Sequence, residues 1–195
     1  GSRALKLKEQ REFKTSFTKI EDFLEAIQIQ LSFSKLNPEN MNRVIQLFQK
    51  TNQFNLTTRR HREEDLKKLE SDGGDVYSIS YEDTFGSQGI ISAITLVPET
   101  DGIYIESWLM SCRVLNRTVE QAVFAFILKK AAGKKVRAEY IPTEKNGLVK
   151  SLYNELGFKK INGHRSGEDE TQEWLYADYD LTGIPPKHYV SINIA

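Results

Sequence analysis

The spacing of apolar residues divides the chain into segments with a period of two and segments with a helical period. Alternating apolar and polar positions are typical of half-buried strands, whereas apolar residues recurring every three or four positions predict helices. The strand-like segments are Ile27–Phe33, Val76–Tyr81, Gly89–Val97, Ile103–Cys112, Val136–Ile141, Phe158–Ile161 and Glu173–Tyr179. Helical segments begin at Pro38, Glu63, Val119 and Asn146, and one or two more helices are expected within residues 3–27.

Turn and capping residues mark the ends of these segments. Asn37 predicts an N-cap before Pro38, and Gly133 and Gly157 predict helix ends. The order is strand, two helices, three strands, helix, strand, helix and two strands, over residues 27–180. This order predicts an α/β fold with a mixed, mainly antiparallel sheet flanked by helices. We expect residues 1–26 to form a helical extension and residues 181–195 a tail.

Composition narrows the class of protein. The 195 residues are 39% hydrophobic and 28% charged, which is typical of a globular domain. Lys plus Arg and Asp plus Glu both number 27, so net charge gives no reason to expect nucleic acid or membrane as a partner. The single Cys excludes an internal disulfide and favours a reducing, cytoplasmic setting. Gly1-Ser2 resembles an expression scar, so we expect the natural protein to be longer.

The most informative segment runs from Asn146 to Phe158. Asn146 and Tyr153 are seven positions apart, which places them on nearly the same face of a helix. Leu residues at 148, 152 and 156 give that helix an apolar stripe, and Gly157 suits the left-handed position at its end. An ordinary amphipathic helix stopped by a glycine remains the alternative.

The pattern Asn-x6-Tyr-x3-Gly-Phe in this segment resembles the last core helix of GNAT acyltransferases. The resemblance implies a GNAT-like sheet whose neighbouring central strands part, with the pantetheine arm of CoA or of a carrier protein bound in the gap. It also implies that Asn146 lies beside this cofactor and that Tyr153 is a general acid next to the thioester sulfur.

A second candidate site lies between the third strand of the meander and the apolar helix at Val119. GNAT enzymes usually carry [Arg/Gln]-x-x-Gly-x-[Gly/Ala] there, and backbone N–H groups bind the CoA pyrophosphate. The corresponding residues are Arg113, Val114, Leu115, Asn116, Arg117 and Thr118, with both small positions changed. Asn116 tolerates the left-handed conformation. Thr118 and Gln121 alternatively predict a capping box.

The polar segment Thr51–Arg60 is a third candidate. It is dense in neutral donors and ends in two guanidinium groups, which suit phosphate or carboxylate ligands. The resemblance implies that this loop lines the acceptor side of the cleft, and a polar connecting loop is the alternative. The substrate-binding candidates are Asn52, Asn55, Thr57, Thr58, Arg59 and Arg60.

Three further residues have side chains that could take part in catalysis. Glu106 lies where several GNAT enzymes place a catalytic base, although a solvated strand residue is the favoured alternative. Cys112 is expected to be a buried, inert thiol. His61 follows the paired arginines and is expected at the surface. The histidines show no metal-binding spacing, so no metal is expected.

The segments TNQFNLTTRR at Thr51–Arg60 and LMSCRVLNRTVE at Leu109–Glu120 together resemble the C-terminal region of FkbH-like proteins. That family supplies glyceryl units for methoxymalonyl-ACP biosynthesis. The resemblance implies an upstream HAD-type domain and an acyl carrier protein as partner.

The expected function is therefore an acyltransferase-type domain that binds a pantetheine arm of CoA or of a carrier protein. Two alternatives remain. One is a non-catalytic docking module for a carrier protein or for the upstream HAD-type domain. The other is an acetyl-CoA-dependent N-acetyltransferase.

Overall fold

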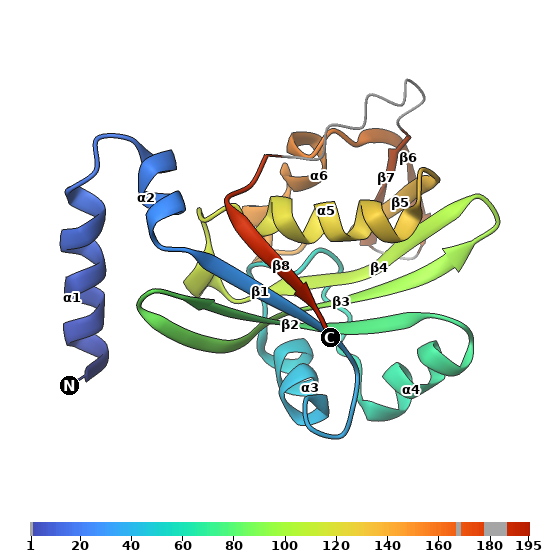
Figure 1. Ribbon diagram of the computed structural model, residues 1–195. Coiled ribbons are helices and arrows are strands. Elements are labelled where there is room, and N and C mark those ends of the chain that lie inside the picture. The colour runs from blue at the N-terminus through green and yellow to red at the C-terminus, as the bar shows by residue number, and fades with distance from the viewer. Residues whose placement is uncertain (1, 167–168, 178–186) are drawn as a thin grey trace.

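A single eight-stranded mixed sheet organises the chain (Figure 1). The computed structural model describes residues 2–166, 169–177 and 187–195, and their side chains except those of 162–166 and 169. The strand order is β6-β7-β5-β4-β3-β2-β1-β8. The strands are β1 Ile29–Lys35, β2 Asp75–Asp83, β3 Gly86–Glu99, β4 Gly102–Met110, β5 Lys135–Tyr140, β6 Lys159–Ser166, β7 Asp169–Tyr176 and β8 Val190–Ile194.

Helices cover both faces of this sheet. α3 (Met41–Lys50) and α4 (Glu63–Ser71) pack on one face, and α5 (Val119–Ala131) and α6 (Leu152–Glu155) lie on the other side (Figure 1). α1 (Ser2–Thr15) and α2 (Ile20–Ala26) precede the sheet, and two 3₁₀ turns, η1 (Cys112–Val114) and η2 (Gly147–Val149), complete the set. The expected α/β architecture, a mixed and mainly antiparallel sheet flanked by helices, is confirmed.

Apolar side chains form a core on each face. On the α5 side, Phe33 and Phe126 stack with ring centroids 4.1 Å apart, and Tyr77 meets Phe126 edge-on. On the α3 side, a smaller cluster joins the two helices to β2, β3 and β4 through Val44, Leu47, Phe48, Leu66, Val76, Ala93 and Leu109. The two clusters bury both faces of the central strands, which hold the segments described below in fixed positions.

Several sequence-based boundaries were wrong. β8 pairs in parallel with β1, so residues of the expected tail extend the sheet. Residues 159–166 and 169–176 form a hairpin where a loop was expected to precede the last strand. The helix expected from Asn146 is instead η2 followed by the four-residue α6. β4 ends at Met110, and Cys112 is exposed in η1 rather than buried in a strand. Tyr179, the expected end of the last strand, lies outside the described residues.

β4 and β5 approach very closely where their pairing begins. A Cβ atom added at Gly102 would lie 1.9 Å from the carbonyl oxygen of Lys135, whereas one added at Gly147 would meet nothing within 4 Å. We predict that Gly102→Ala lowers the free energy of unfolding by about 1–3 kcal/mol, the usual cost of overpacking. Gly147→Ala, the matched control, should change it by less than about 0.5 kcal/mol. Urea unfolding measures both, and equal stability of the two variants would contradict the prediction.

Candidate functional site

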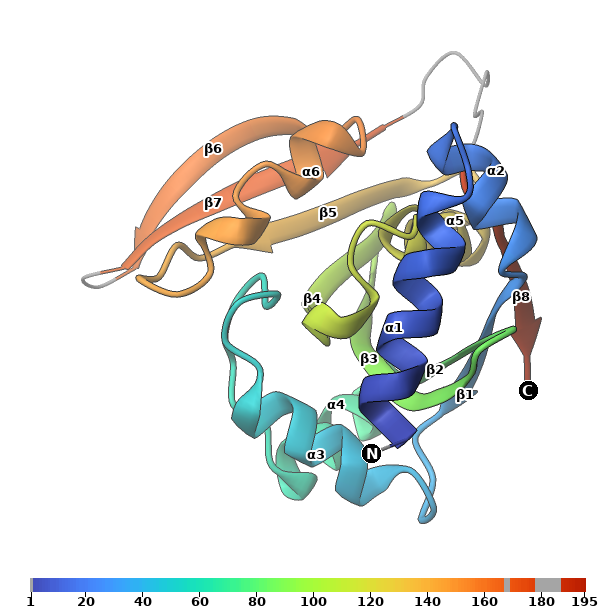
Figure 2. The same ribbon diagram turned by 90° about the vertical axis from the view of Figure 1, so that its left-hand side faces the viewer.

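A β-bulge separates β4 from β5 in the middle of the sheet. The register of β3 with β4 steps from Thr95↔Ser107 to Leu96↔Ile105, which leaves Glu106 as an extra residue in β4. The parallel pairing of β4 with β5 ends immediately before it, at Ile105↔Ala138. Beyond this point β5 diverges from β4 (Figure 2). Bulges redirect side chains and end pairing, and here one produces the splayed strands that the sequence predicts.

The gap between the parted strands is filled by the chain itself. Residues Phe54–Leu56, here called the inserted segment, run antiparallel to the free edge of β4. Leu56 N–H donates to the Trp108 carbonyl oxygen at 3.1 Å, and Met110 N–H donates to that of Phe54 at 3.0 Å. On the other side, Ile141 N–H donates to the Leu56 carbonyl oxygen at 2.9 Å. The side chains of the inserted segment, Phe54, Asn55 and Leu56, are all buried.

Asn146 holds this segment in place. Its Nδ2 donates to the carbonyl oxygens of Asn55 at 3.0 Å and Ile141 at 2.9 Å, and its Oδ1 accepts from Thr143 N–H at 2.8 Å. Both amide hydrogens are thus used within the protein, and the side chain is completely buried. Asn146 therefore ties the inserted segment to the turn after β5, and no donor is left for a cofactor.

Asn55 and Thr58 shape the segment locally. Asn55 Oδ1 accepts from Thr58 N–H at 2.9 Å, and Asn55 Nδ2 donates to the Thr51 carbonyl oxygen. Thr58 has φ of +53°, which is rare for a β-branched residue, and its buried hydroxyl has no partner in the described part of the chain. This strained turn directs Arg59 back across the sheet.

Tyr153 lies beside the filled gap. Its ring packs near those of Trp108 and Phe158, with centroids 6.2 and 4.9 Å away. The side chain is 1% exposed, and its hydroxyl finds no hydrogen-bond partner among the described residues. Burial, together with the charge of Glu139, raises the pKa of Tyr153 well above its ordinary value. The hydroxyl is therefore protonated at neutral pH and buried without a partner.

Arg59 bridges the two parted strands. Its guanidinium forms ion pairs with Glu106 of β4 at 3.4 Å and with Glu139 of β5 at 2.9 Å, and donates to the Tyr104 hydroxyl. The same group and the Thr57 hydroxyl also donate to the backbone carbonyl oxygen of Glu106. The anions that Arg59 meets are thus the protein's own carboxylates.

Glu106 is not the solvated strand residue that was favoured. The bulge turns its carboxylate, 12% exposed, toward donors from neighbouring strands and the loop before α4. Ser107 and Thr95 hydroxyls donate to it, as does His61 Nε2, at 2.9 Å. Burial alone would raise the pKa of Glu106, but the bonds from His61 and Thr95 and the Arg59 charge outweigh it and lower that pKa. His61, expected at the surface, is correspondingly half-buried against Phe48.

Arg60 points away from this network. Its guanidinium donates to the carbonyl oxygens of Phe48 and Thr51 at 2.7 and 2.8 Å and also to the Asn52 side chain. A cation at these carbonyls complements the C-terminal end of α3. The two adjacent arginines therefore have different structural roles. Arg59 joins β4 to β5, whereas Arg60 caps α3 and positions Asn52.

The turn between β4 and α5 keeps the backbone shape that the sequence predicts. Asn116 and Thr118, at the positions where GNAT enzymes have small residues, have φ of +61° and +60°. The prediction of a capping box was wrong, because the Thr118 hydroxyl accepts a hydrogen bond from Tyr189 N–H at 3.1 Å and makes no bond to the helix N-terminus. Arg117 pairs with Asp83 and Tyr81, whereas Val114 is buried and Leu115 half-buried in the core.

A carboxylate lies at the start of α5, where the phosphate was expected. Burial raises the pKa of Glu120, and a hydrogen bond from its own backbone N–H opposes that rise. The first turn of a helix favours anions, and Glu120 belongs to it. The residues present do not fit CoA, because the inserted segment already bonds the open edge of β4, where the resemblance places the pantetheine arm.

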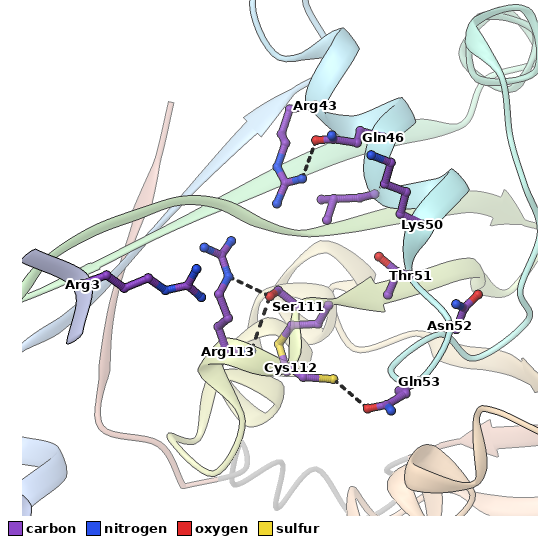
Figure 3. Close-up of a pocket in the computed structure, with 12 residues that line it drawn as sticks. Arg3, Arg43, Gln46, Lys50, Thr51, Asn52, Gln53, Ser111, Cys112 and Arg113 are labelled. Atoms are coloured by element: carbon purple, nitrogen blue, oxygen red, sulfur yellow. Dashed lines mark hydrogen bonds between the residues drawn. The ribbon is translucent and has the colours of Figure 1, made fainter. Parts of the chain in front are cut away.

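An open pocket lies at the end of β4, on the α3 side. Its volume is about 620 Å³, and Figure 3 shows the guanidinium groups of Arg3, Arg43 and Arg113 directed toward it. Asn52 belongs to its wall, as do Lys50, Thr51, Gln53, Ser111 and Cys112. Only Asn52 and Arg113 were sequence candidates. The basic residues Arg3, Arg43 and Lys50 went unnoticed because they are widely separated in the chain and form no local motif.

Comparison with known proteins identifies the fold through solved structures and not through sequence matches. No family model and no curated protein matches the sequence. Solved structures do match: ribosomal-protein-S18-alanine N-acetyltransferase from Escherichia coli has 12% identity and a TM-score of 0.58, over 78% of this chain and 99% of that one. Spermidine N-acetyltransferase from Vibrio cholerae, in complex with CoA and spermine, has 12% identity and a TM-score of 0.55, over 75% and 95%.

A protein from Desulfovibrio desulfuricans assigned to the GNAT acetyltransferase family has 13% identity and a TM-score of 0.59, over 75% of this chain and 98% of that one. The chain therefore has the GNAT acetyltransferase fold. Among the described residues, no helix is both long and apolar enough to cross a bilayer. The same residues contain no group of His, Cys, Asp or Glu side chains arranged to hold a metal ion.

The Glu106 network makes a pH-dependent contribution to stability. Because the pKa of Glu106 in the folded state is below its ordinary value of 4.5, the contribution is complete above that pH and is lost as the pH falls through the folded-state pKa. We predict that Glu106→Gln lowers the free energy of unfolding at pH 7 by about 3 kcal/mol. The difference from the wild type should shrink at pH values below 4.5.

Urea unfolding at a series of pH values measures this difference. Glu82→Gln, which removes an exposed carboxylate from β2, is the matched control and should change stability by less than about 0.5 kcal/mol. A Glu106→Gln effect that is independent of pH would show that the charge of Glu106 does not stabilise the fold.

Proposed function

We propose that this chain is a non-catalytic binding module with a GNAT fold, which holds a phosphopantetheine-bearing acyl carrier protein for a separate catalytic domain. The observation that carries the proposal is the filled gap between β4 and β5. The inserted segment already bonds Trp108 and Met110, the backbone groups on the open edge of β4. A pantetheine arm cannot pair with that edge while the segment is in place.

Opening the gap is costly. Three backbone hydrogen bonds would break, and the side chains of Phe54 and Leu56, now buried, would be exposed. A net hydrogen bond contributes about 1 kcal/mol and a buried Leu or Phe about 2 kcal/mol, so opening costs on the order of several kcal/mol. The Arg59 bridge between Glu106 and Glu139 resists the same movement. Each 1.4 kcal/mol weakens a ligand about tenfold, which argues against productive CoA binding.

The carrier protein as partner is inferred from the sequence resemblance to FkbH-like proteins. Members of that family pair a HAD-type domain with a GNAT-like one, and the HAD-type domain loads a three-carbon acyl group onto a carrier thiol. A GNAT-like domain whose gap is filled has no part in that chemistry but offers a rigid surface. The proposal therefore assigns catalysis, in the making of glyceryl or methoxymalonyl units, to the upstream domain.

We predict that acetylpantetheine, which lacks phosphate and so tests the gap alone, does not change the rate of hydrogen exchange at the amides of Leu56 and Ile141. These amides bond across the gap, and a ligand that entered it would have to break both bonds. Titration with a holo acyl carrier protein should show binding under the same conditions. Exchange measured by NMR with millimolar acetylpantetheine provides the test.

Asn146→Ala is the control that shows the assay can detect an open gap. Removing its two donated hydrogen bonds should raise the exchange rate at Leu56 by about thirtyfold, since two such bonds together contribute about 2 kcal/mol. Altered exchange in the wild type on addition of acetylpantetheine, or its turnover, would refute the binding-module proposal.

Acyl transfer is a second candidate, and the buried hydroxyl of Tyr153 favours it. A buried donor without a partner costs about 1–3 kcal/mol, and such costs often persist at functional sites. The enzyme would transfer a carrier-bound acyl group or acetylate a small amine, as the name of spermidine N-acetyltransferase states for that protein. In either case, CoA or phosphopantetheine would have to displace the inserted segment.

Tyr153→Phe separates the two functions. For a binding module we predict that this substitution preserves carrier binding and leaves the protein equally or more stable by about 1 kcal/mol, because it removes an unpartnered buried hydroxyl. For an acyltransferase, turnover should fall by about 10²–10⁴-fold. Thermal melting and an acyl-transfer assay on the same preparations measure both. A large loss of activity in a folded variant would establish the enzyme.

A further inference from the structure

The pocket at the end of β4 carries positive charge that the protein does not neutralise. Arg3, Arg43, Lys50 and Arg113 line it, and no acidic residue does. Within the described part of the chain, none of the four forms an ion pair. By contrast, three half-buried arginines, Arg59, Arg117 and Arg137, are each paired with carboxylates.

Arg43 and Arg113 bond only to neutral groups. Arg43 donates to the Ile90 carbonyl oxygen and to Gln46, and Arg113 donates to Ser111 and to Gln88. These bonds fix the direction of the Arg43 and Arg113 guanidinium groups without neutralising their charge. Burial, followed by the charge of Arg113, lowers the pKa of Arg43, as expected where like charges are held close together.

We propose that this pocket binds the phosphate group of a phosphate ester. Several guanidinium groups converging on one space, with an ammonium group beside them, suit a phosphate dianion, whose oxygens accept from several donors at once. Hydroxyl and amide side chains of Thr51, Gln53 and Ser111 supply neutral donors at the rim. A volume of about 620 Å³ lies within the usual range for small-molecule sites.

This site shares Arg113 with the turn before α5, where the resemblance places the CoA pyrophosphate, but residues 114–118 of that turn do not line it. It is formed by α1, α3, the segment after α3 and the end of β4. The proposal does not depend on the gap between β4 and β5. Inorganic pyrophosphate tests it without any pantetheine, so its failure is distinguishable from failure of the binding-module proposal.

Cys112 makes the pocket directly observable. It is the chain's single cysteine, it is exposed, and it lines the pocket, with its thiol beside Gln53 (Figure 3). The experiment measures the rate at which Cys112 reacts with neutral dithiodipyridine and with dianionic dithiobis(nitrobenzoate), at constant ionic strength, as pyrophosphate is added. A ligand in the pocket protects the thiol from both reagents and does so saturably. Charge screening alone slows only the anionic reagent.

We expect saturable protection from both reagents in the wild type. Arg43→Gln and Arg113→Gln should each raise the pyrophosphate concentration for half-protection by about tenfold, the effect of losing one charge-assisted hydrogen bond. Arg43→Gln removes the bond to Ile90 and could disturb α3. Arg113 is exposed, so Arg113→Gln should fold and tests the proposal independently. Arg11→Gln, which removes an exposed charge elsewhere on α1, is the matched control and should change nothing.

Comparing phosphopantetheine with pantetheine extends the test to an organic ester. Protection by the first and not by the second is expected, because only the first carries phosphate. Protection confined to the anionic reagent, or equal protection in the wild type and in Arg113→Gln, would overturn the proposal.

Discussion

The insertion of Phe54–Leu56 between β4 and β5 is the constraint on which the rest of the site depends. The bulge at Glu106 parts the two strands and leaves the edge of β4 without a partner. Buried backbone groups must be paired, and the inserted segment pairs them. On one side, Asn146 bonds the inserted segment. On the other side, Arg59, which follows the segment in the chain, ties β4 to β5 through ion pairs with Glu106 and Glu139. The polar loop is thus part of the sheet's interior.

The distribution of charge follows from this arrangement. Since the inserted segment brings Arg59 over the sheet, the carboxylates of Glu106 and Glu139 acquire a counter-charge, and both have lowered pKa values despite burial. Arg137 continues the network to Glu99 and stacks on the Tyr104 ring at 4.0 Å. On the α3 side, Arg60 is used to cap the helix, and no carboxylate reaches the pocket at the end of β4. Uncompensated charge therefore remains where the chain is open to solvent.

The sequence predicted what local patterns encode. Alternation identified the meander, and the left-handed positions at Asn116 and Gly157 followed from residue type and spacing. Predictions failed where a distant partner decides the outcome. The Thr118 hydroxyl is taken by Tyr189, 71 positions away. Glu106 is buried because a bulge turns it toward Thr95 and His61. β8 forms because β1 offers it an edge, and the pocket arginines converge only through the fold.

The features that the resemblance implies differ in how they are used here. The bulge, the parted strands and the left-handed turn are properties of the backbone, and all three are present together with the inserted segment. Asn146 and Tyr153 also persist, but Asn146 now serves the inserted segment, and Tyr153 packs against Trp108 and Phe158. Residues that match a catalytic sequence pattern can therefore form hydrogen bonds and packing contacts within the protein itself. Function has to be inferred from which donors and acceptors remain free. Among the described residues, the guanidinium groups without a counter-charge lie in the basic pocket, whereas the unpartnered hydroxyl of Tyr153 lies beside the gap of the sheet.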